Sequence, residues 1–535
     1  MGVRDPGEEP IAASPRARRP RTSTNIDHDH AYTRRRGTAP AARRPGRGRQ
    51  GGRGGRGGRG SQVWLRAPAW AVQLAVLAPI ALAYLWMAVL ASRGLSGDEP
   101  HYLAITQGLW LYHTLDQTPV LVVHHDFFAY YHSLMSSHSL HRDGRLYPLH
   151  PLGLPILLLP GFALAGAVGA RATVALLAVL LCWRTLRLAT RLVGPVPAAL
   201  AVLGLGLSAP FVLNAGAIYP DVASGLALAL AYEAIDAARL TVRRALALGL
   251  LLAAMPWLHV KLLVVVAAYM AWAAYALLYG RPRDGARASA RRTVLLAALA
   301  LDPPVLSVAA LIAFNGVVYG SPGLTAQFAL RGQALLTGNP LGGMVGQLFA
   351  QGQGALGTAP LLLLAIPGAV ALWRRDRATA LKVGLVTLPF WIVTLTYRDW
   401  WGGDCPPLRY LVPMLPLWTL GIAALLDGLR ARASRLAVGL AGAASLLLAL
   451  AMPGAPLYGW TLPDGQGGLL VGLGRGIGLP LSAWFPLFEP TKTGPGLWRH
   501  AWLIPLWTAV FVALWLFVAW RERLARSSSR SRKSG

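Results

Sequence analysis

The sequence contains few cysteines and few acidic residues. Only two of its 535 residues are cysteine, and these two, Cys182 and Cys405, are far apart and have no partner pattern. A disulfide framework and a thiolate metal site are therefore excluded. Asp and Glu number 22, charged residues make up 14% of the chain, and hydrophobic residues make up 54%. With so little charge and so many Leu and Ala runs, we expect a polytopic membrane protein rather than a soluble globule.

The positive charge is concentrated at the two ends of the chain. Lys and Arg number 51 and give a net charge of +29, and Arg-rich tails flank the apolar body. Residues 1–60 end in GRGRQGGRGGRGGRG, a low-complexity composition that cannot bury a core. Arg/Gly repeats can bind RNA, but we expect residues 1–66 to be a disordered cytosolic tail and expect no nucleic-acid partner. Residues 521–535 are expected to form a second basic cytosolic tail.

The apolar runs predict an all-α bundle of about twelve transmembrane helices. One doubtful segment, Pro151 to Ala170, is rich in proline and glycine, and we expect it only to dip into the membrane. The expected spans are residues 68–92, 172–190, 196–213, 221–239, 244–258, 262–280, 293–317, 358–373, 382–396, 409–427, 436–452 and 500–520.

The basic residues predict the orientation of these spans. With the N-terminus inside, the short Arg-rich connections all fall in the cytosol, as the positive-inside rule requires. We therefore expect both termini in the cytosol and a multi-pass protein of the inner (cytoplasmic) membrane. Residues 67–452 would form the main membrane region, with residues 93–171 as its large first outer loop, and residues 453–499 an outer loop of unassigned role.

The first outer loop begins with SGDEPHYL, residues 96–103, which contains the adjacent acids Asp98 and Glu99. A charge within hydrocarbon costs roughly 2.5–3.5 kcal/mol, so acids beside a span are expensive unless they face water and have a use. We interpret this stretch as a catalytic corner. The alternative is that Asp98 caps a helix beginning at Pro100.

Three further features have an open interpretation. Eight of the twelve histidines lie in the first outer loop, which suggests a metal, but their spacing matches no compact ligand pattern; water-exposed histidines are favoured, and a divalent metal remains a possible cofactor. Asp221, at the end of NAGAIYPD, is expected to cap a helix, with a substrate contact as the alternative. Asp302, within a span, is expected to face a protein interior and has no assigned role.

Two other outer connections contain basic and aromatic residues. The motif MPWLHVK, residues 255–261, presents His259 and Lys261, and phosphate binding is favoured over a lysine that only reaches lipid headgroups. The motif YRDWWGGDCPPLRY, residues 397–410, carries paired tryptophans and Arg409. Tryptophans are common in interfacial belts but also stack on sugars, and Arg409 offers a bidentate fork for phosphate.

Together these motifs resemble the GT-C superfamily of membrane glycosyltransferases, in particular the bacterial branch related to protein O-mannosyltransferases and the lipid A aminoarabinose transferase. The likeness covers most of residues 68–430 and lies in GDEPHYL, LYPLHPLGLPILLLPGFALAG, Arg171, IYPD, PWLHVK, FNGVVYGSPG and WWGGDCPPLRYLVPMLPL. The chain departs from the family at Asp221, where glutamate is more usual, and at Cys405, Pro406 and Pro407.

The resemblance implies transfer of a sugar from a polyprenyl-phosphate donor to a glycan, lipid or protein acceptor, with inversion. Asp98 would be the general base, with Glu99 orienting it or exchanging roles with it. Lys261, Arg409 and His259 would stabilise the phosphate leaving group. The expected substrate contacts are Tyr102, Asp126, Asp221, Trp400, Trp401 and Asp404.

The main alternative is a secondary transporter or flippase-like protein without transferase activity. Such a protein predicts internal repeats and charges near the membrane midplane. The sequence contains no repeat between its halves, and its charged motifs gather at one face. A transferase is therefore favoured.

Overall fold

The computed structural model describes residues 68–91, 95–123, 139–237, 240–279, 290–330, 336–403, 405–451, 466–489 and 497–534. The expected tail at residues 1–66 lies outside these ranges. So do two of the expected substrate contacts, Asp126 and Asp404.

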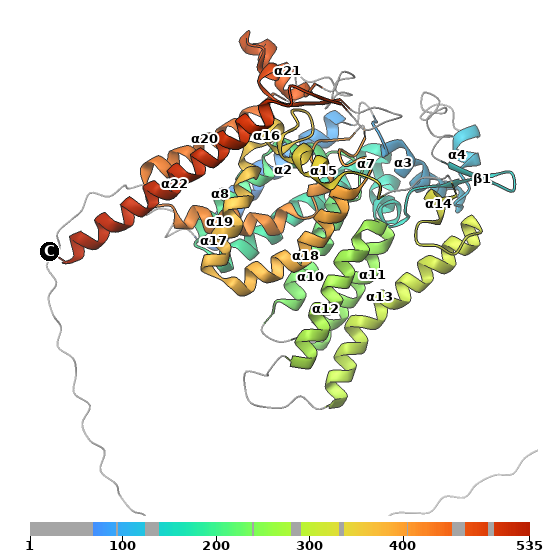
Figure 1. Ribbon diagram of the computed structural model, residues 1–535. Helices are drawn as coiled ribbons and strands as arrows, with labels where there is room; N and C mark the ends of the chain where they lie inside the picture. Colours follow the sequence, from blue (N-terminus) through green and yellow to red (C-terminus); the bar gives the residue numbers. More distant parts are fainter. Residues whose placement is uncertain are drawn as a thin grey trace, which may run out of the picture. The chain divides into compact units, whose positions relative to one another are not determined.

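Apolar helices make up most of the structure (Figure 1). The longer ones are α2 (Ala69–Ala91), α7 (Gly153–Leu192), α8 (Pro195–Gly206), α10 (Asp221–Ile235), α11 (Val242–Leu258), α12 (Leu263–Tyr279), α13 (Ala290–Tyr319), α15 (Pro340–Phe349), α17 (Ala365–Arg375), α18 (Arg377–Thr396), α19 (Leu415–Gly428), α20 (Arg432–Leu450), α21 (Gly468–Ile477) and α22 (Leu503–Ser534).

Shorter elements connect these helices, mostly at one end of the bundle. They are the helices α3 (Glu99–Gln107), α4 (Thr118–Val123), α9 (Ala209–Ala215), α14 (Ala326–Ala329) and α16 (Ala355–Thr358), the π turn η1 (Gly108–Tyr112), and the 3-10 turns η3 (Val260–Leu262), η4 (Pro360–Leu364), η5 (Arg409–Leu411) and η7 (Leu481–Trp484). Two antiparallel hairpins pair β1 (Ser139–Arg142) with β2 (Arg145–Pro148) and β3 (Leu487–Glu489) with β4 (Leu497–Arg499).

The helices make this an all-α, multi-pass membrane protein, as the sequence predicts. Within the described residues, seven helices are long and apolar enough to cross a membrane, and α8 with α9, bent by 64°, could form an eighth span. Every expected span coincides with helical structure, but α10, α11, α17 and α19 have 15, 17, 11 and 14 residues. Twelve crossings therefore remain a prediction.

The proline-rich segment at the start of α7 is separate from the rest of that helix. Ala165 and Gly166 have non-helical backbone angles, with Gly166 at φ 57°, a region that favours glycine. The chain reverses so closely there that a Cβ on Gly161 would clash with the backbone of Gly169. Residues 153–164 are thus not continuous with the span that contains Arg171.

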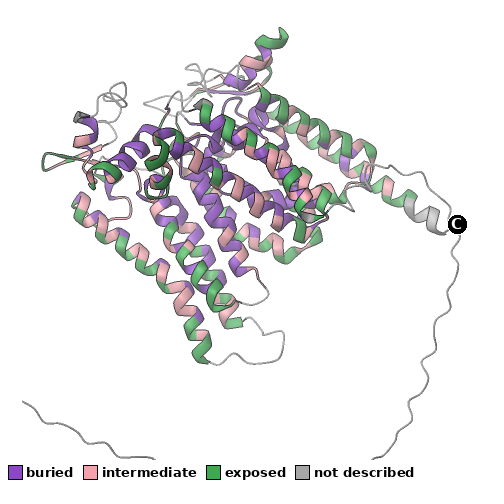
Figure 2. Ribbon diagram, turned by 180° about the vertical axis from the view of Figure 1, so that it is seen from behind, coloured by how far each residue is buried: buried purple, intermediate pink, exposed green. Residues whose placement is uncertain are grey.

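The core lies around α7, α10 and α19 (Figure 2). Helix α10 is apolar on nearly all sides and buried along almost its whole length, which is typical of a helix enclosed by other helices. Peripheral helices such as α13 and α22 expose apolar side chains such as Val317 and Leu516, as expected for surfaces in contact with lipid. Asp302 on α13 is exposed, so the expectation that it faces a protein interior is wrong. Helix α13 packs on α11 through Leu299 and Pro303 instead, where Gly249 allows close approach.

Arg142 anchors the segment expected to be the first outer loop to α13. Arg142, in β1, donates from one guanidinium nitrogen to the carbonyl oxygens of Val317 (3.0 Å) and Val318 (3.1 Å) near the C-terminus of that helix. These carbonyls have no partner in the helical ladder, so a cation is favoured there. This contact fixes the β1–β2 hairpin against the bundle.

Candidate active site

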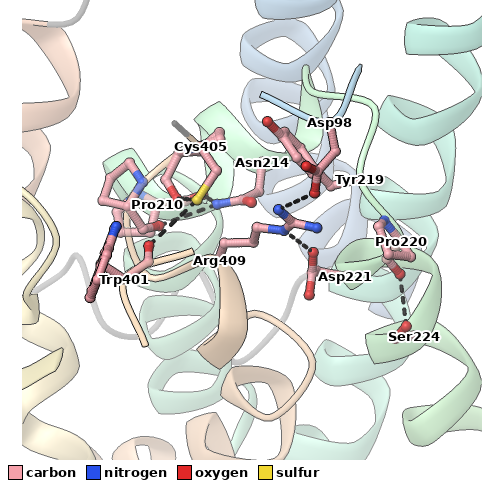
Figure 3. A network of polar contacts seen from close by, with 12 residues as sticks. Asp98, Pro210, Asn214, Tyr219, Pro220, Asp221, Ser224, Trp401, Cys405 and Arg409 are labelled. Carbon is pink, nitrogen blue, oxygen red and sulfur yellow. Dashed lines mark hydrogen bonds and ion pairs between the residues drawn. The ribbon is translucent and has the colours of Figure 1, made fainter. Parts of the chain in front are cut away.

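A buried arginine joins two carboxylates from distant parts of the chain (Figure 3). Arg409 is 4% exposed. One terminal guanidinium nitrogen donates to Asp98 Oδ2 (2.7 Å), and its Nε donates to Asp221 Oδ2 (2.8 Å). The structure thus brings together three of the residues that the sequence singled out.

Tight backbone turns direct these three side chains toward one point. Asp98 is at the N-cap position of α3, directly after Gly97 at φ 53°, and Arg409 follows Leu408 at φ 55°. Asp98 makes no side-chain hydrogen bond to the helix that follows it, so the capping alternative is wrong for this residue. The same holds for Asp221, because Pro220 occupies the N-cap position of α10 and the Asp221 carboxylate accepts from Arg409.

The remaining contacts hold Arg409 in place. Its guanidinium carbon lies 4.0 Å from the centre of the Tyr219 ring, and the Tyr219 hydroxyl donates to the carbonyl of Ser96 (2.9 Å). Asn214 donates to the carbonyl of Pro407 (3.3 Å) and fixes the segment that leads to Arg409 (Figure 3). Tyr219 lies within the IYPD string, but no feature of the sequence marked it as a site residue.

Asp98 is held in its ionised form. Burial acts to raise the pKa of Asp98, but the Arg409 guanidinium, together with His150 and His101, holds that pKa well below its usual range. The carboxylate is therefore available to accept a proton at neutral pH.

A second buried cation lies beside this network. Lys261, in η3, is 7% exposed, and its ammonium lies 3.4 Å from the centre of the Tyr410 ring and 4.0 Å from that of Tyr397. The Nδ1 atom of His259 accepts from the backbone N–H of Lys261 (3.2 Å) and so fixes the turn. Lys261 forms no ion pair with any residue that the structure describes. Two aromatic faces partly offset the cost of burying this charge, and an anionic ligand would offset it further.

The carboxylate of Glu99, by contrast, pairs with Arg171 and not with Arg409. Its Oε1 accepts from two nitrogens of Arg171 (2.9 and 3.3 Å) and from the backbone N–H of Ile218 (2.9 Å). Its Oε2 accepts from the backbone N–H of Ser96 (2.9 Å). Glu99 and Arg171 are 3% and 0% exposed. These contacts make Glu99 a structural carboxylate and do not support an exchange of roles with Asp98.

The paired tryptophans pack against protein aromatic rings. The centres of the Trp400 and Trp401 rings lie 4.8 and 5.2 Å from that of Phe488, which lies 5.2 Å from Trp498. Trp400 also fills the space beside Gly346 of α15. The structure therefore gives both tryptophans a packing role, and Phe488 of β3 with Trp498 of β4 completes this aromatic cluster.

The other expected site residues have separate positions. Tyr102 is buried in α3, with its ring centre 4.8 Å from that of His150. Asp126 and Asp404 lie outside the described residues. Among the described residues, no three His, Cys, Asp or Glu side chains come together as metal ligands.

An apolar groove is lined in part by Leu411, two residues after Arg409. Its volume is about 680 Å³, and α17, α18 and α19 form most of its walls. Its lining includes Leu411 of η5 and Leu415 of α19, which follow Arg409 closely in the sequence. Trp391 and Trp418 contribute aromatic surface. A groove of this size and composition suits a hydrocarbon chain.

No protein-family model matches the sequence, and no curated protein sequence matches it. In structure, the chain is similar to ArnT from Cupriavidus metallidurans in the apo state (TM-score 0.44, 16% identity, covering 74% of this chain and 65% of that one). It is similar to ArnT from Cupriavidus metallidurans bound to undecaprenyl phosphate, with a TM-score of 0.44 and 16% identity, covering 71% of this chain and 65% of that one. It is also similar to the oligosaccharyltransferase AglB from Archaeoglobus fulgidus in complex with an inhibitory peptide and a dolichol-phosphate. Here the TM-score is 0.40 and the identity 13%, covering 79% of this chain and 57% of that one.

This chain spans less than two thirds of the length of each of these proteins. Both are GT-C glycosyltransferases, the superfamily that the sequence motifs resemble. The likeness extends to the helical architecture and no further.

Proposed function

We propose that the protein is an integral membrane glycosyltransferase that moves a sugar from a polyprenyl-phosphate donor to an acceptor hydroxyl on the outer face of the cytoplasmic membrane, with inversion. The observation that carries this proposal is the buried Lys261 ammonium beside the Asp98–Arg409–Asp221 network. A buried cation that forms no ion pair in the described part of the chain, next to an ionised carboxylate, suits a reaction in which a phosphate leaves and a hydroxyl loses its proton.

Lys261 is the expected ligand of the donor phosphate. A buried ammonium gains more from an anion than an exposed one, because solvent screens the attraction less. The phosphate gains charge as the bond to the sugar breaks, so a fixed cation at this position stabilises the transition state more than the ground state. Arg409 adds a second positive charge, and Asp221 keeps its guanidinium in position.

Asp98 is the expected general base. As the acceptor oxygen forms its bond to the anomeric carbon, the acceptor proton moves to the Asp98 carboxylate. The bond from that carbon to the phosphate oxygen breaks, and the phosphate leaves with the electron pair. Attack from the face opposite the phosphate inverts the anomeric centre.

The groove between α17, α18 and α19 supplies a place for the prenyl chain. Its wall includes Leu411, two residues after Arg409, so a lipid headgroup near Arg409 would place its hydrocarbon chain at the groove. A chain that extends along the membrane-facing helices remains in an apolar environment throughout.

A transporter is the weaker alternative on the same evidence. In a secondary transporter, charged groups near the midplane of broken helices bind the cargo. Here Asp98, Asp221, Lys261 and Arg409 all lie at helix ends or in short turns between helices. This placement favours chemistry at one face of the bundle.

The test is transfer of radiolabelled sugar from polyprenyl-phosphate donors to membrane acceptors by the purified protein in liposomes. We expect Asp98→Asn to lower the rate by about 10²–10⁴-fold while donor binding is retained. Asp143→Asn is the matched control, since Asp143 is in the same outer loop with a side chain that is 84% exposed. Equal rates in wild type and Asp98→Asn would remove Asp98 from the mechanism. No transfer by the wild type with any donor would contradict the proposed function.

A further inference from the structure

His150 lies between two small cavities, one of them lined by residues of α3, the helix that follows Asp98. Each cavity has about the volume that one water molecule needs. The first, about 10 Å³, is lined by His101, Ala104, Gln117, Leu121, Ser139, Pro148 and His150. The second, about 20 Å³, has His150, Asn315, Tyr319 and Gln327 among its lining residues. His150 thus forms a wall of both.

Each cavity is also lined by a buried amide oxygen that has no hydrogen-bond partner in the described part of the chain. Gln117 is 3% exposed, and its Nε2 donates to the carbonyl of Leu115 (3.1 Å) while its Oε1 has no partner. Gln327 is 7% exposed, and its Oε1 likewise has none. A buried unsatisfied acceptor costs about 1–3 kcal/mol. One water in each cavity would satisfy these oxygens and bring a donor to His150.

Neighbouring rings fix the position of the His150 imidazole. Its ring centre lies 5.3 Å from that of His101, with the planes 22° apart, and 4.8 Å from that of Tyr102. The Tyr319 hydroxyl donates to the carbonyl of Pro148 (2.8 Å), two residues before His150. The imidazole is therefore held between helix α3, which follows Asp98, and the end of α13.

We propose that His150 carries the proton from Asp98 to the outer solution through water molecules held beside Gln117 and Gln327. The inference rests on the proposed function, because it concerns the proton that Asp98 takes from the acceptor. His150 touches neither the acceptor nor the donor and acts through Asp98.

The proton balance is complete without a further reactant. Asp98 receives the acceptor proton and becomes a neutral carboxyl group. It passes this proton to the neutral imidazole of His150, which becomes an imidazolium and restores the Asp98 carboxylate. The imidazolium then releases the proton through an adjacent water. Transfer runs in this direction because the Arg409 cation holds the pKa of Asp98 well below its usual range while His150 is neutral, whereas imidazole ordinarily titrates near about 6.5.

The relay predicts a specific pH dependence. Transfer requires neutral His150, so the rate should fall as the pH drops through the His150 pKa. Asp98 stays ionised over the same range and cannot cause this fall. Other titratable groups face His150 from the surrounding elements, namely Asp98, His101, Tyr102, His259 and Tyr319. His101→Gln therefore serves as a second comparison, and we expect it to keep the acid-side fall.

The experiment measures kcat for sugar transfer at saturating donor from pH 5 to pH 8. We expect His150→Asn to lower kcat by about 10–10²-fold at pH 7.5, to leave the donor KM unchanged, and to lose the acid-side fall. Gln117→Leu and Gln327→Leu should lower kcat by smaller factors with the same KM. His141→Asn is the matched control, because His141 is an exposed histidine of the same loop. Free imidazole should restore transfer to His150→Ala but not to Asp98→Ala.

The possible outcomes separate the relay from the proposed function. If the wild type transfers sugar and His150→Asn has the wild-type rate and pH profile, the relay is wrong and the function stands. A higher donor KM in His150→Asn with an unchanged pH profile would make His150 a binding residue and also overturn the relay. Absence of transfer by the wild type would overturn both proposals. If His150→Ala does not fold, imidazole rescue cannot be measured. The kcat and pH profile of His150→Asn, with the kcat of Gln117→Leu and Gln327→Leu, then decide whether the relay is right.

Discussion

Arg171 and Lys261 are both buried cations, but within the described residues only Arg171 forms an ion pair. Arg171 is 0% exposed and pairs with Glu99 at 2.9 Å. Lys261 is 7% exposed and contacts the rings of Tyr397 and Tyr410 instead. Burying a charge costs free energy that a partner must offset. The charge of Arg171 is thus neutralised within the protein, whereas Lys261 is suited to a ligand that brings negative charge.

The Glu99–Arg171 ion pair explains why the two acids of SGDEPHYL differ in role. Glu99 joins three segments, because it accepts from Arg171 of α7, from Ile218 before α10 and from Ser96 of its own turn. These contacts fix the backbone on both sides of Asp98. Glu99 therefore positions its neighbour through the main chain, while Asp98 keeps its carboxylate toward Arg409.

The largest expected effect is on stability and comes from breaking the Glu99–Arg171 ion pair. Glu99→Gln keeps the size of the side chain but leaves the Arg171 charge buried without a counter-charge. We expect the free energy of unfolding to fall by about 3–5 kcal/mol. Thermal unfolding of the purified protein in detergent measures this change.

The matching variant separates charge from packing. Glu99→Leu combined with Arg171→Met removes both charges, and it should recover most of the stability that Glu99→Gln loses. If Glu99→Gln were as stable as wild type while Asp98→Asn unfolded readily, the assignment of structural and reactive acids would have to be reversed.

A smaller effect is expected at Lys261, and in activity rather than stability. Lys261→Met removes a buried charge that forms no ion pair with a described carboxylate, so we expect no loss in the free energy of unfolding. The donor KM should rise by roughly 10–150-fold, because a hydrogen bond to a charged group contributes about 1.5–3 kcal/mol. Steady-state transfer at varied donor concentration measures the change.

Two comparisons sharpen the Lys261 result. Lys261→Arg keeps the charge and should lose less affinity than Lys261→Met. Arg475→Met removes an exposed charge from α21, and it should leave the donor KM unchanged. A Lys261→Met protein with normal donor KM but low stability would assign Lys261 to the fold.

Much of the fold and part of the site could be predicted from the sequence. Apolar runs locate helices because a chain in lipid must satisfy its backbone within each helix. Charges are rare in such a chain, so Asp98, Lys261 and Arg409 stand out by their presence alone. Their contacts were not readable, since Asp98 and Arg409 are 311 positions apart and Asp221 and Arg409 are 188 apart.

Other side chains had two plausible environments in the sequence. Trp400 and Trp401 pack against Phe488, which comes from a segment with no motif of its own, and their contact with substrate stays a prediction. Asp221 occupies a position that suits a cap, but an arginine brought by another segment attracts its carboxylate more strongly. Local sequence specifies what a side chain is able to do, and tertiary contacts select among these options.

The smallest expected effect concerns an ion pair that water can reach. Arg375 of α17 and Asp427 of α19 are 2.5 Å apart, with side chains 40% and 31% exposed. We expect Asp427→Asn to change the free energy of unfolding by only about 0–1 kcal/mol, since solvent screens an exposed pair and both partners remain hydrated when separated. Arg375 also donates to the carbonyl of Leu192 (2.9 Å), so it keeps a partner in the variant. Thermal unfolding of Asp427→Asn beside Glu99→Gln, at low and high salt, measures the difference between the two pairs. If Asp427→Asn lowered the free energy of unfolding as much as Glu99→Gln does, burial would not determine how much an ion pair contributes to stability in this protein.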